Sequence, residues 1–154
     1  MELIRNIDQS ESLNFMIHDT QIFPEDTDET VTLTAGGAGN AWTAAWTRIA
    51  DNNAINMDSK FTGIQTHIAS VVLESVDQTG ELYIAEFGYG PDADNITTIA
   101  RIRAVGGAQA KLPPKSQDRI RTLHIPSDSK FWYRSKCAVG GGAMTIHFRF
   151  YCHS

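Results

Sequence analysis

The alternation of apolar and polar residues is clearest at the end of the chain, in FWYRSKC, AVGGGA and MTIHFRFYCHS. Successive side chains of a strand point to opposite faces, so residues of one parity share a face. One parity of this region is apolar: Phe131, Tyr133, Cys137, Met144, Ile146, Phe148, Phe150 and Cys152. We therefore predict a β-hairpin from Phe131 to Tyr151 that turns at AVGGGA and has one face in the core.

The opposite parity of the same two segments is aromatic and basic. Closing the predicted hairpin at AVGGGA sets Trp132 across from Arg149, and Arg134 across from His147. Tryptophan and arginine are favoured at the centres of interfaces. The candidate binding or interface residues are therefore Trp132, Arg134, His147 and Arg149. A local cation–π pair that merely covers the sheet is the alternative.

Short β-like segments separated by turns occupy most of the remaining chain. Strands are predicted at 31–34, from 61 onward with Ile64, Ile68 and Val72 on one face, and at 81–89, 96–105 and 119–125. AGGAGN is predicted to be a flexible turn. AWTAAWTRIA also fits a helical face, but a strand is favoured, with Trp42 and Trp46 in the core.

This pattern predicts an all-β protein, a two-sheet antiparallel β-sandwich that is jelly-roll-like. The chain of 154 residues, with 42% hydrophobic residues, suits one domain with its own core. Residues 1–30 are predicted to be an N-terminal arm or peripheral segment, and residues 31–154 the β-sandwich domain.

Charge and hydropathy narrow the classes of function. The formal net charge of −5 argues against nucleic acid or an anionic membrane as the main partner. The N-terminal residues lack the apolar region of a secretory signal, and no apolar run approaches the roughly 20 residues of a membrane span. We expect the chain to be made in a cytoplasm.

The two cysteines are predicted to be free residues of the core. In the hairpin register Cys137 lies near Met144, so Cys152 is eight positions further along, about 27 Å at the rise of a strand. A disulfide needs Cα atoms roughly 4.4 to 6.8 Å apart. Two cysteines alone also cannot form a zinc site.

The chain carries no recognisable catalytic motif, so we predict a protein that is not an enzyme and that has no cofactor. The chain has no GxSxG, no HExxH and no phosphate-binding glycine loop, and its histidines are scattered. Asp92, Asp94 and Asn95 in GPDADN could offer oxygen ligands to calcium, but Asp and Asn are also good turn formers, which is the favoured interpretation. A solvated acidic segment is predicted for Asp26, Asp28 and Glu29.

Residues 42–151 resemble, in pattern, a family of small jelly-roll-like virion proteins of tailed bacteriophages. The resemblance rests on AWTRIA, FTGIQTHIAS, ELYIAEFGYGPDADNITTIARI, LHIPSDSKFWYRSK and GGGAMTIHFRFY. It implies a non-enzymatic virion protein, foremost a capsid decoration or cement subunit that stabilises the head. A tail-associated receptor- or glycan-binding module is the alternative. The expected partners are the major capsid protein or other virion proteins, together with further copies of the chain in a trimer.

Overall fold

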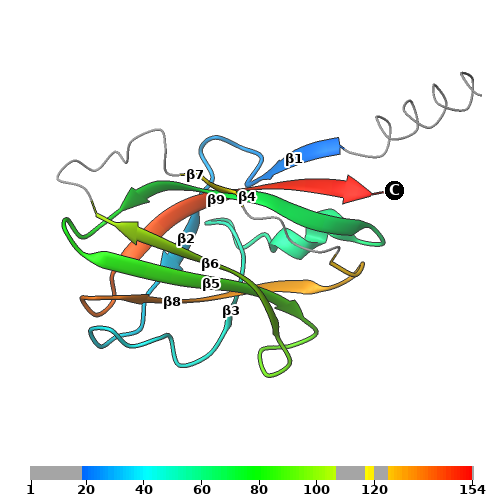
Figure 1. Cartoon of the computed structure of the whole chain (residues 1–154). Helices are drawn as coiled ribbons and strands as arrows, with labels where there is room; N and C mark the ends of the chain where they lie inside the picture. Colours follow the sequence, from blue (N-terminus) through cyan, green and yellow to red (C-terminus); the bar gives the residue numbers. More distant parts are fainter. Residues whose placement is uncertain (1–18, 107–116, 120–124, 154) are drawn as a thin grey trace, which may run out of the picture.

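The computed structural model describes residues 19–106, 117–119 and 125–153, which fold into two antiparallel β-sheets packed face to face. Figure 1 shows the two layers, with β1, β4, β7 and β9 in one and β3, β5, β6 and β8 in the other. A single 3-10 helix, η1 (Met57–Phe61), lies among the described segments. The predicted all-β two-sheet sandwich is confirmed.

Sheet A has β9 (Ala143–His153) at its centre. This strand pairs along its length with β4 (Gln65–Val76), and on its other side with β1 (Asp19–Phe23) and β2 (Val31–Thr34). The short β7 (Gln117–Arg119) pairs with the outer edge of β4. Part of the segment predicted as an arm, residues 19–23, is thus a strand of this sheet, whereas residues 1–18 lie outside the described range.

Sheet B has the order β3-β8-β5-β6. Its strands are β3 (Thr47–Arg48), β8 (Lys130–Cys137), β5 (Leu82–Gly90) and β6 (Thr97–Val105). β8 shows the predicted alternation in full, since its buried and half-buried residues alternate from Lys130 to Cys137. One parity of the strand is therefore in the core, and the other forms the outer face of sheet B.

The core fills the space between the two sheets. It contains aromatic side chains from both, and the ring of Phe87 on β5 meets that of Phe148 on β9 edge to face at 5.3 Å. Phe61 of η1 closes one side, 4.4 Å from the ring of Phe150. Cys137 and Cys152 are buried in this core and form no disulfide, as predicted. Such aromatic packing is a main source of stability for a sandwich of this size.

The predicted terminal hairpin is wrong. β8 pairs with β5 and β3, whereas β9 pairs with β4, β1 and β2, so the turn between β8 and β9 carries the chain from one sheet to the other. Both strands alternate as expected, but alternation reports only which face of a strand is buried. It does not report which strand lies alongside. The predicted cross-strand pairs between β8 and β9 therefore do not form.

Two glycine-rich segments lie directly against each other beside this crossover. Ala35 N–H donates to the Gly142 carbonyl, and Gly141 N–H donates to the Gly36 carbonyl. A Cβ on Gly140 would come within 2.2 Å of the Gly37 carbonyl oxygen. The glycines of AGGAGN and AVGGGA therefore permit a close backbone approach, in addition to forming turns.

Two local predictions need correction. A β-bulge between Ile68 and Ser70 shifts the parity of β4, so Val71 is buried in the core and Val72 is not on the face of Ile68. The segment 41–50 is mostly irregular, with only Thr47–Arg48 in a strand. In the described part of the chain, no helix has the length and apolarity needed to cross a membrane.

Candidate functional site

The outer face of sheet B carries the candidate site. Its outward positions on β8 are Lys130, Trp132, Arg134 and Lys136, because the residues between them enter the core. On β5 the outward positions include Leu82, Ile84 and Glu86, and on β6 they include Arg101, Arg103 and Val105. Glu86 is the only acidic residue among the strand positions named here, so the face is cationic although the chain is acidic overall.

Glu86 lies at the centre of this face and is bonded from both sides. It is the register partner of Arg134 on β8 and of Arg101 on β6. Its Oε2 accepts a hydrogen bond from Arg134 Nε at 2.6 Å, and its Oε1 accepts one from Arg101 Nε at 2.7 Å. Its side chain is only 3% exposed, against 37% for Arg134 and 56% for Arg101. The two guanidinium groups thus cover the carboxylate and remain open to solvent.

The protonation of Glu86 follows from this arrangement. Burial raises the pKa of the carboxyl group, but the hydrogen bonds and charges of Arg101 and Arg134 outweigh burial and leave the pKa below its ordinary value. Glu86 is therefore an anion at neutral pH whose hydrogen-bonding capacity is directed to its two arginines. The arrangement is that of a structural ion-pair network rather than of a general acid or base.

Two tryptophans flank Arg134 from the segment before β3. The guanidinium carbon of Arg134 lies 4.8 Å from the ring centroid of Trp42 and 4.9 Å from that of Trp46, and Lys136 Nζ lies 5.1 Å from Trp42. Both tryptophans are half-buried, so the prediction that they belong to the core is wrong. Thr43 N–H donates to the Ser135 carbonyl, which holds this segment alongside β8.

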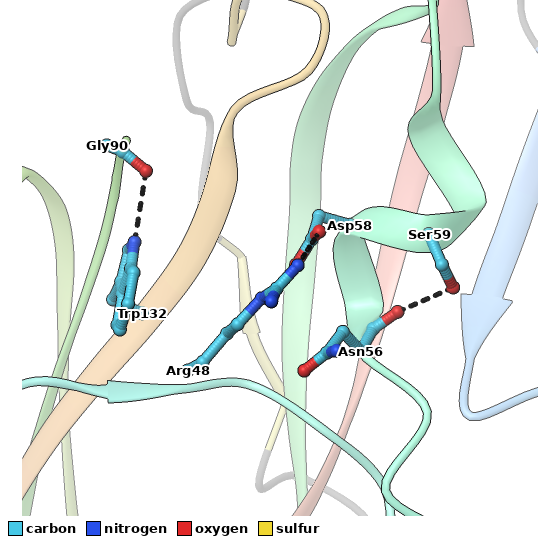
Figure 2. Close-up of polar contacts among 6 residues, drawn as sticks. All are labelled: Arg48, Asn56, Asp58, Ser59, Gly90 and Trp132. Atoms are coloured by element: carbon cyan, nitrogen blue, oxygen red, sulfur yellow. Dashed lines mark hydrogen bonds and ion pairs between the residues drawn. The ribbon is translucent and has the colours of Figure 1, made fainter. Parts of the chain in front are cut away.

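Trp132 and Arg48 are paired through backbone register, and each also has a polar partner of its own (Figure 2). Trp132 Nε1 donates to the Gly90 carbonyl at 3.1 Å, at the end of β5. Arg48 forms a two-pronged pair with Asp58 of η1, with Nε to Oδ1 at 2.9 Å. The Trp132 indole is thus an anchor between β8 and β5, with the rest of its ring half-exposed.

His147 and Arg149 do not join this face. They are outward positions of β9, on the outer face of sheet A, where His147 pairs with Glu74 at 2.7 Å and Arg149 is exposed. The predicted four-residue surface is therefore divided between opposite sides of the sandwich. Trp132 and Arg134 remain neighbours on sheet B, but neither faces His147 or Arg149 across a strand pair.

Sequence reasoning missed four contributors to the sheet B cluster: Glu86, Arg101 and the two tryptophans that contact Arg134, Trp42 and Trp46. The sequence held one usable signal, because Arg101 and Arg103 share a parity on a predicted strand. Their relation to Glu86 depends on the pairing of β5 with β6, including an irregular register between Phe87 and Gly88. No spacing along the chain specifies that register.

The GPDADN loop is organised by its own side chains. Asp92 Oδ1 accepts hydrogen bonds from the backbone N–H groups of Asp94 and Asn95, and the Asn95 amide donates to both oxygens of Asp92. These bonds lower the pKa of Asp92 below its ordinary value. An aspartate that forms a turn typically makes such hydrogen bonds to the backbone that follows it. Within the described ranges, no group of three or more His, Cys, Asp or Glu residues could hold a metal ion.

A small open depression of about 210 Å³ lies beside this loop. Its walls are the end of β5, the start of β6 and the turn at residues 127–129. The Asp128 carboxylate in this turn accepts a hydrogen bond from Gly63 N–H at 3.1 Å, which ties the turn to the segment between η1 and β4. The depression is smaller than typical ligand pockets, which begin at about 300 Å³.

Comparisons with known protein families, with curated proteins and with solved structures found no match for this chain. The geometry of the sheet B face is therefore the basis on which a function is argued. The face combines half-buried tryptophans with exposed cations on a rigid sheet, a combination that suits recognition of another molecule.

Proposed function

We propose that the chain is a non-enzymatic structural protein of a bacteriophage virion, foremost a capsid decoration subunit, and that it binds its virion partners through the outer face of sheet B. The proposal has two supports: the order of the strands, and the aromatic and cationic character of this face. The resemblance of residues 42–151 to phage virion proteins agrees with it.

The strand order is the observation that carries the proposal. The strands pair as nested antiparallel partners: β1 and β2 with β9, β3 with β8, β4 with β7, and β5 with β6. Successive pairs alternate between the sheets, which gives β1-β9-β4-β7 opposite β3-β8-β5-β6. This order supports a jelly roll, an architecture common in viral capsid proteins and in lectins. A fold alone does not define function, so the face must supply the second support.

The sheet B face has the composition of a protein contact surface. Arg134 is held between Trp42 and Trp46 and by Glu86, which limits the conformational freedom that it would lose on binding. Arg101 and Arg103 are exposed beside it. A preorganised cluster of tryptophan and arginine is the type of feature that dominates binding energy at interfaces.

The proposal is tested on purified phage particles. We expect the chain to be found in intact particles by mass spectrometry. Particles from a phage lacking its gene should lose integrity at a lower temperature than wild type, and after a smaller reduction of the salt concentration. Absence of the chain from particles would overturn the virion assignment. Presence without any effect of the deletion would overturn the decoration role.

A tail-associated glycan or receptor reader is the second candidate, favoured by the half-exposed Trp132 ring next to Arg134. Aromatic rings of this kind can stack against sugars, and lectins also use the jelly roll. A glycan array with wild type and Trp132→Ala tests this candidate. If this function is correct, wild type should bind glycans on the array and Trp132→Ala should not. An array on which wild type binds no glycan would overturn it.

A further inference from the structure

The sheet B face ends in an apolar patch bordered by cations. Leu82 on β5 and Val105 on β6 are register partners, both point outward, and they are 39% and 59% exposed. Val139, 41% exposed, follows Ala138, whose N–H donates to the Leu82 carbonyl. Arg103 on β6 and Lys136 on β8 are the two register partners of Ile84, the next outward position on β5. We call Leu82, Arg103, Val105, Lys136 and Val139 the cationic patch.

The acidic counterpart lies in the other layer. The loop between β1 and β2, strands of sheet A, contains Glu25, Asp26, Asp28 and Glu29 and no basic residue. It is bonded to the 51–55 turn, because Asn53 Nδ2 donates to Glu29 Oε1 and Asn52 N–H donates to the Thr30 carbonyl. That turn exposes Ile55, 42% accessible. We call residues 25–29 with Ile55 the acidic patch.

Each patch therefore combines exposed aliphatic surface with a net charge, and the two net charges are opposite in sign. In the acidic patch Lys60 Nζ pairs with Glu25 at 3.2 Å, and Asp26, Asp28 and Glu29 supply the remaining negative charge. Exposed large hydrophobic residues are few in the described part of the chain: Ile22, Ile55, Leu82, Val105 and Val139. All but Ile22 belong to one of the two patches, and Ile22 is on β1, immediately before the acidic loop. Apolar surface bordered by polar residues marks interaction sites, and complementary charges favour one partner and one orientation.

The positions of the patches exclude their meeting within one molecule. The cationic patch is on the outer side of sheet B, and the acidic loop joins strands of sheet A, the opposite layer in Figure 1. A contact between unlike patches of two copies is heterologous, and such contacts close into rings or continue as filaments. The trimer expected from the sequence would be one such closed ring.

We propose that the cationic patch of one copy binds the acidic patch of a second copy, head to tail. This inference rests on the use of the sheet B face as a contact surface in the proposed function, and it names the chain itself as the occupant of one end of that face. Association should be strongest at low salt, because the contact is bordered by exposed charges that salt screens.

The test measures self-association of the purified full chain by sedimentation and light scattering. At about 100 µM protein and low salt, a concentration at which micromolar contacts are occupied, we expect a mass that is a multiple of 17.0 kDa. Both Arg103→Glu and Asp28→Lys should weaken association by at least about tenfold, because each places like charges across the contact. Arg149→Glu is the matched control on the outer face of sheet A and should associate as wild type does.

Mixing the two disrupted variants gives a further readout. Arg103→Glu retains an intact acidic patch and Asp28→Lys an intact cationic patch, so the mixture should associate more strongly than either variant alone. Circular dichroism of each variant verifies that it folds. A wild type that stays at 17.0 kDa, or an Arg103→Glu variant that associates normally, would overturn the inference. Neither result bears on whether the chain occurs in phage particles, so the two proposals fail separately.

Discussion

Glu86 on β5 lies directly opposite Arg134 on β8, and Arg134 Nε donates a 2.6 Å hydrogen bond to Glu86 Oε2. The pair is on the outer face of sheet B, yet the Glu86 side chain is almost fully buried beneath its arginines and their neighbours. A carboxylate desolvated in this way depends on both cations for its stability. The pair therefore links the stability of the sheet to the geometry of the proposed contact surface.

Glu86→Gln should destabilise the protein by about 2 kcal/mol, since it removes a buried anion that accepts hydrogen bonds from two arginines. Unfolding in urea measures the change. Glu74→Gln is the matched control, because Glu74 is 41% exposed and its pair with His147 should contribute less than about 0.5 kcal/mol. Equal losses in the two variants would contradict the central role of Glu86.

Acid should destabilise the protein through the same carboxylate. The pKa of Glu86 is lowered from its ordinary value of 4.5, so its contribution is complete above that pH and is lost as the pH falls through the lower folded-state pKa. We expect a melting temperature that is steady near neutral pH and falls below about pH 4.5. Glu86→Gln should flatten this fall in part, because Asp77, whose pKa is also lowered, still titrates.

Arg134→Ala should change the tryptophan fluorescence as well as the stability. It removes the cation between Trp42 and Trp46 and the partner of Glu86, for an expected cost of about 2 kcal/mol. Quenching by acrylamide should increase, because the two rings lose their cover. Arg149→Ala on sheet A should alter neither property. A fluorescence change in Arg149→Ala would instead favour the terminal hairpin, in which Arg149 lies across from Trp132.

Asp77 should contribute more to stability than its position in a turn suggests. Its Oδ1 accepts hydrogen bonds from the Tyr83 hydroxyl at 2.5 Å and from Ala143 N–H at 2.9 Å, which joins the end of β4 to β5 and β9. Asp77→Ala should cost about 2 kcal/mol, and Tyr83→Phe about 1 kcal/mol, because the latter removes one hydroxyl. Thermal unfolding measures both. A larger loss of stability in Tyr83→Phe than in Asp77→Ala would contradict this prediction.

Calcium should leave the melting temperature unchanged. Asp92, the best candidate ligand by sequence, already accepts hydrogen bonds from Asp94 and from Asn95. Scanning calorimetry with millimolar calcium and with chelator measures the effect. A calcium-dependent rise that disappears in Asp92→Ala would show that the loop rearranges to bind the ion.

The sequence by itself determined the fold class and most of the strands. Alternation correctly assigned the faces of β8 and β9, because the period of two follows from backbone geometry alone. It failed at β4, where a bulge between Ile68 and Ser70 moves Val71 and Leu73 to the core face and a second register shift follows between Leu73 and Ser75. It also failed for Trp42 and Trp46, whose hydrophobicity suggested the core although they cover the outer face.

Only the tertiary structure decided which strands are neighbours. β8 and β9 are adjacent in sequence, but each pairs with strands more distant in the chain, and their apolar faces meet in the core from opposite sheets. This separation divides Trp132 and Arg134 from His147 and Arg149. It also brings Glu86 between Arg101 and Arg134, residues 15 and 48 positions away in the chain. Such contacts depend on register between distant strands, which no local pattern encodes.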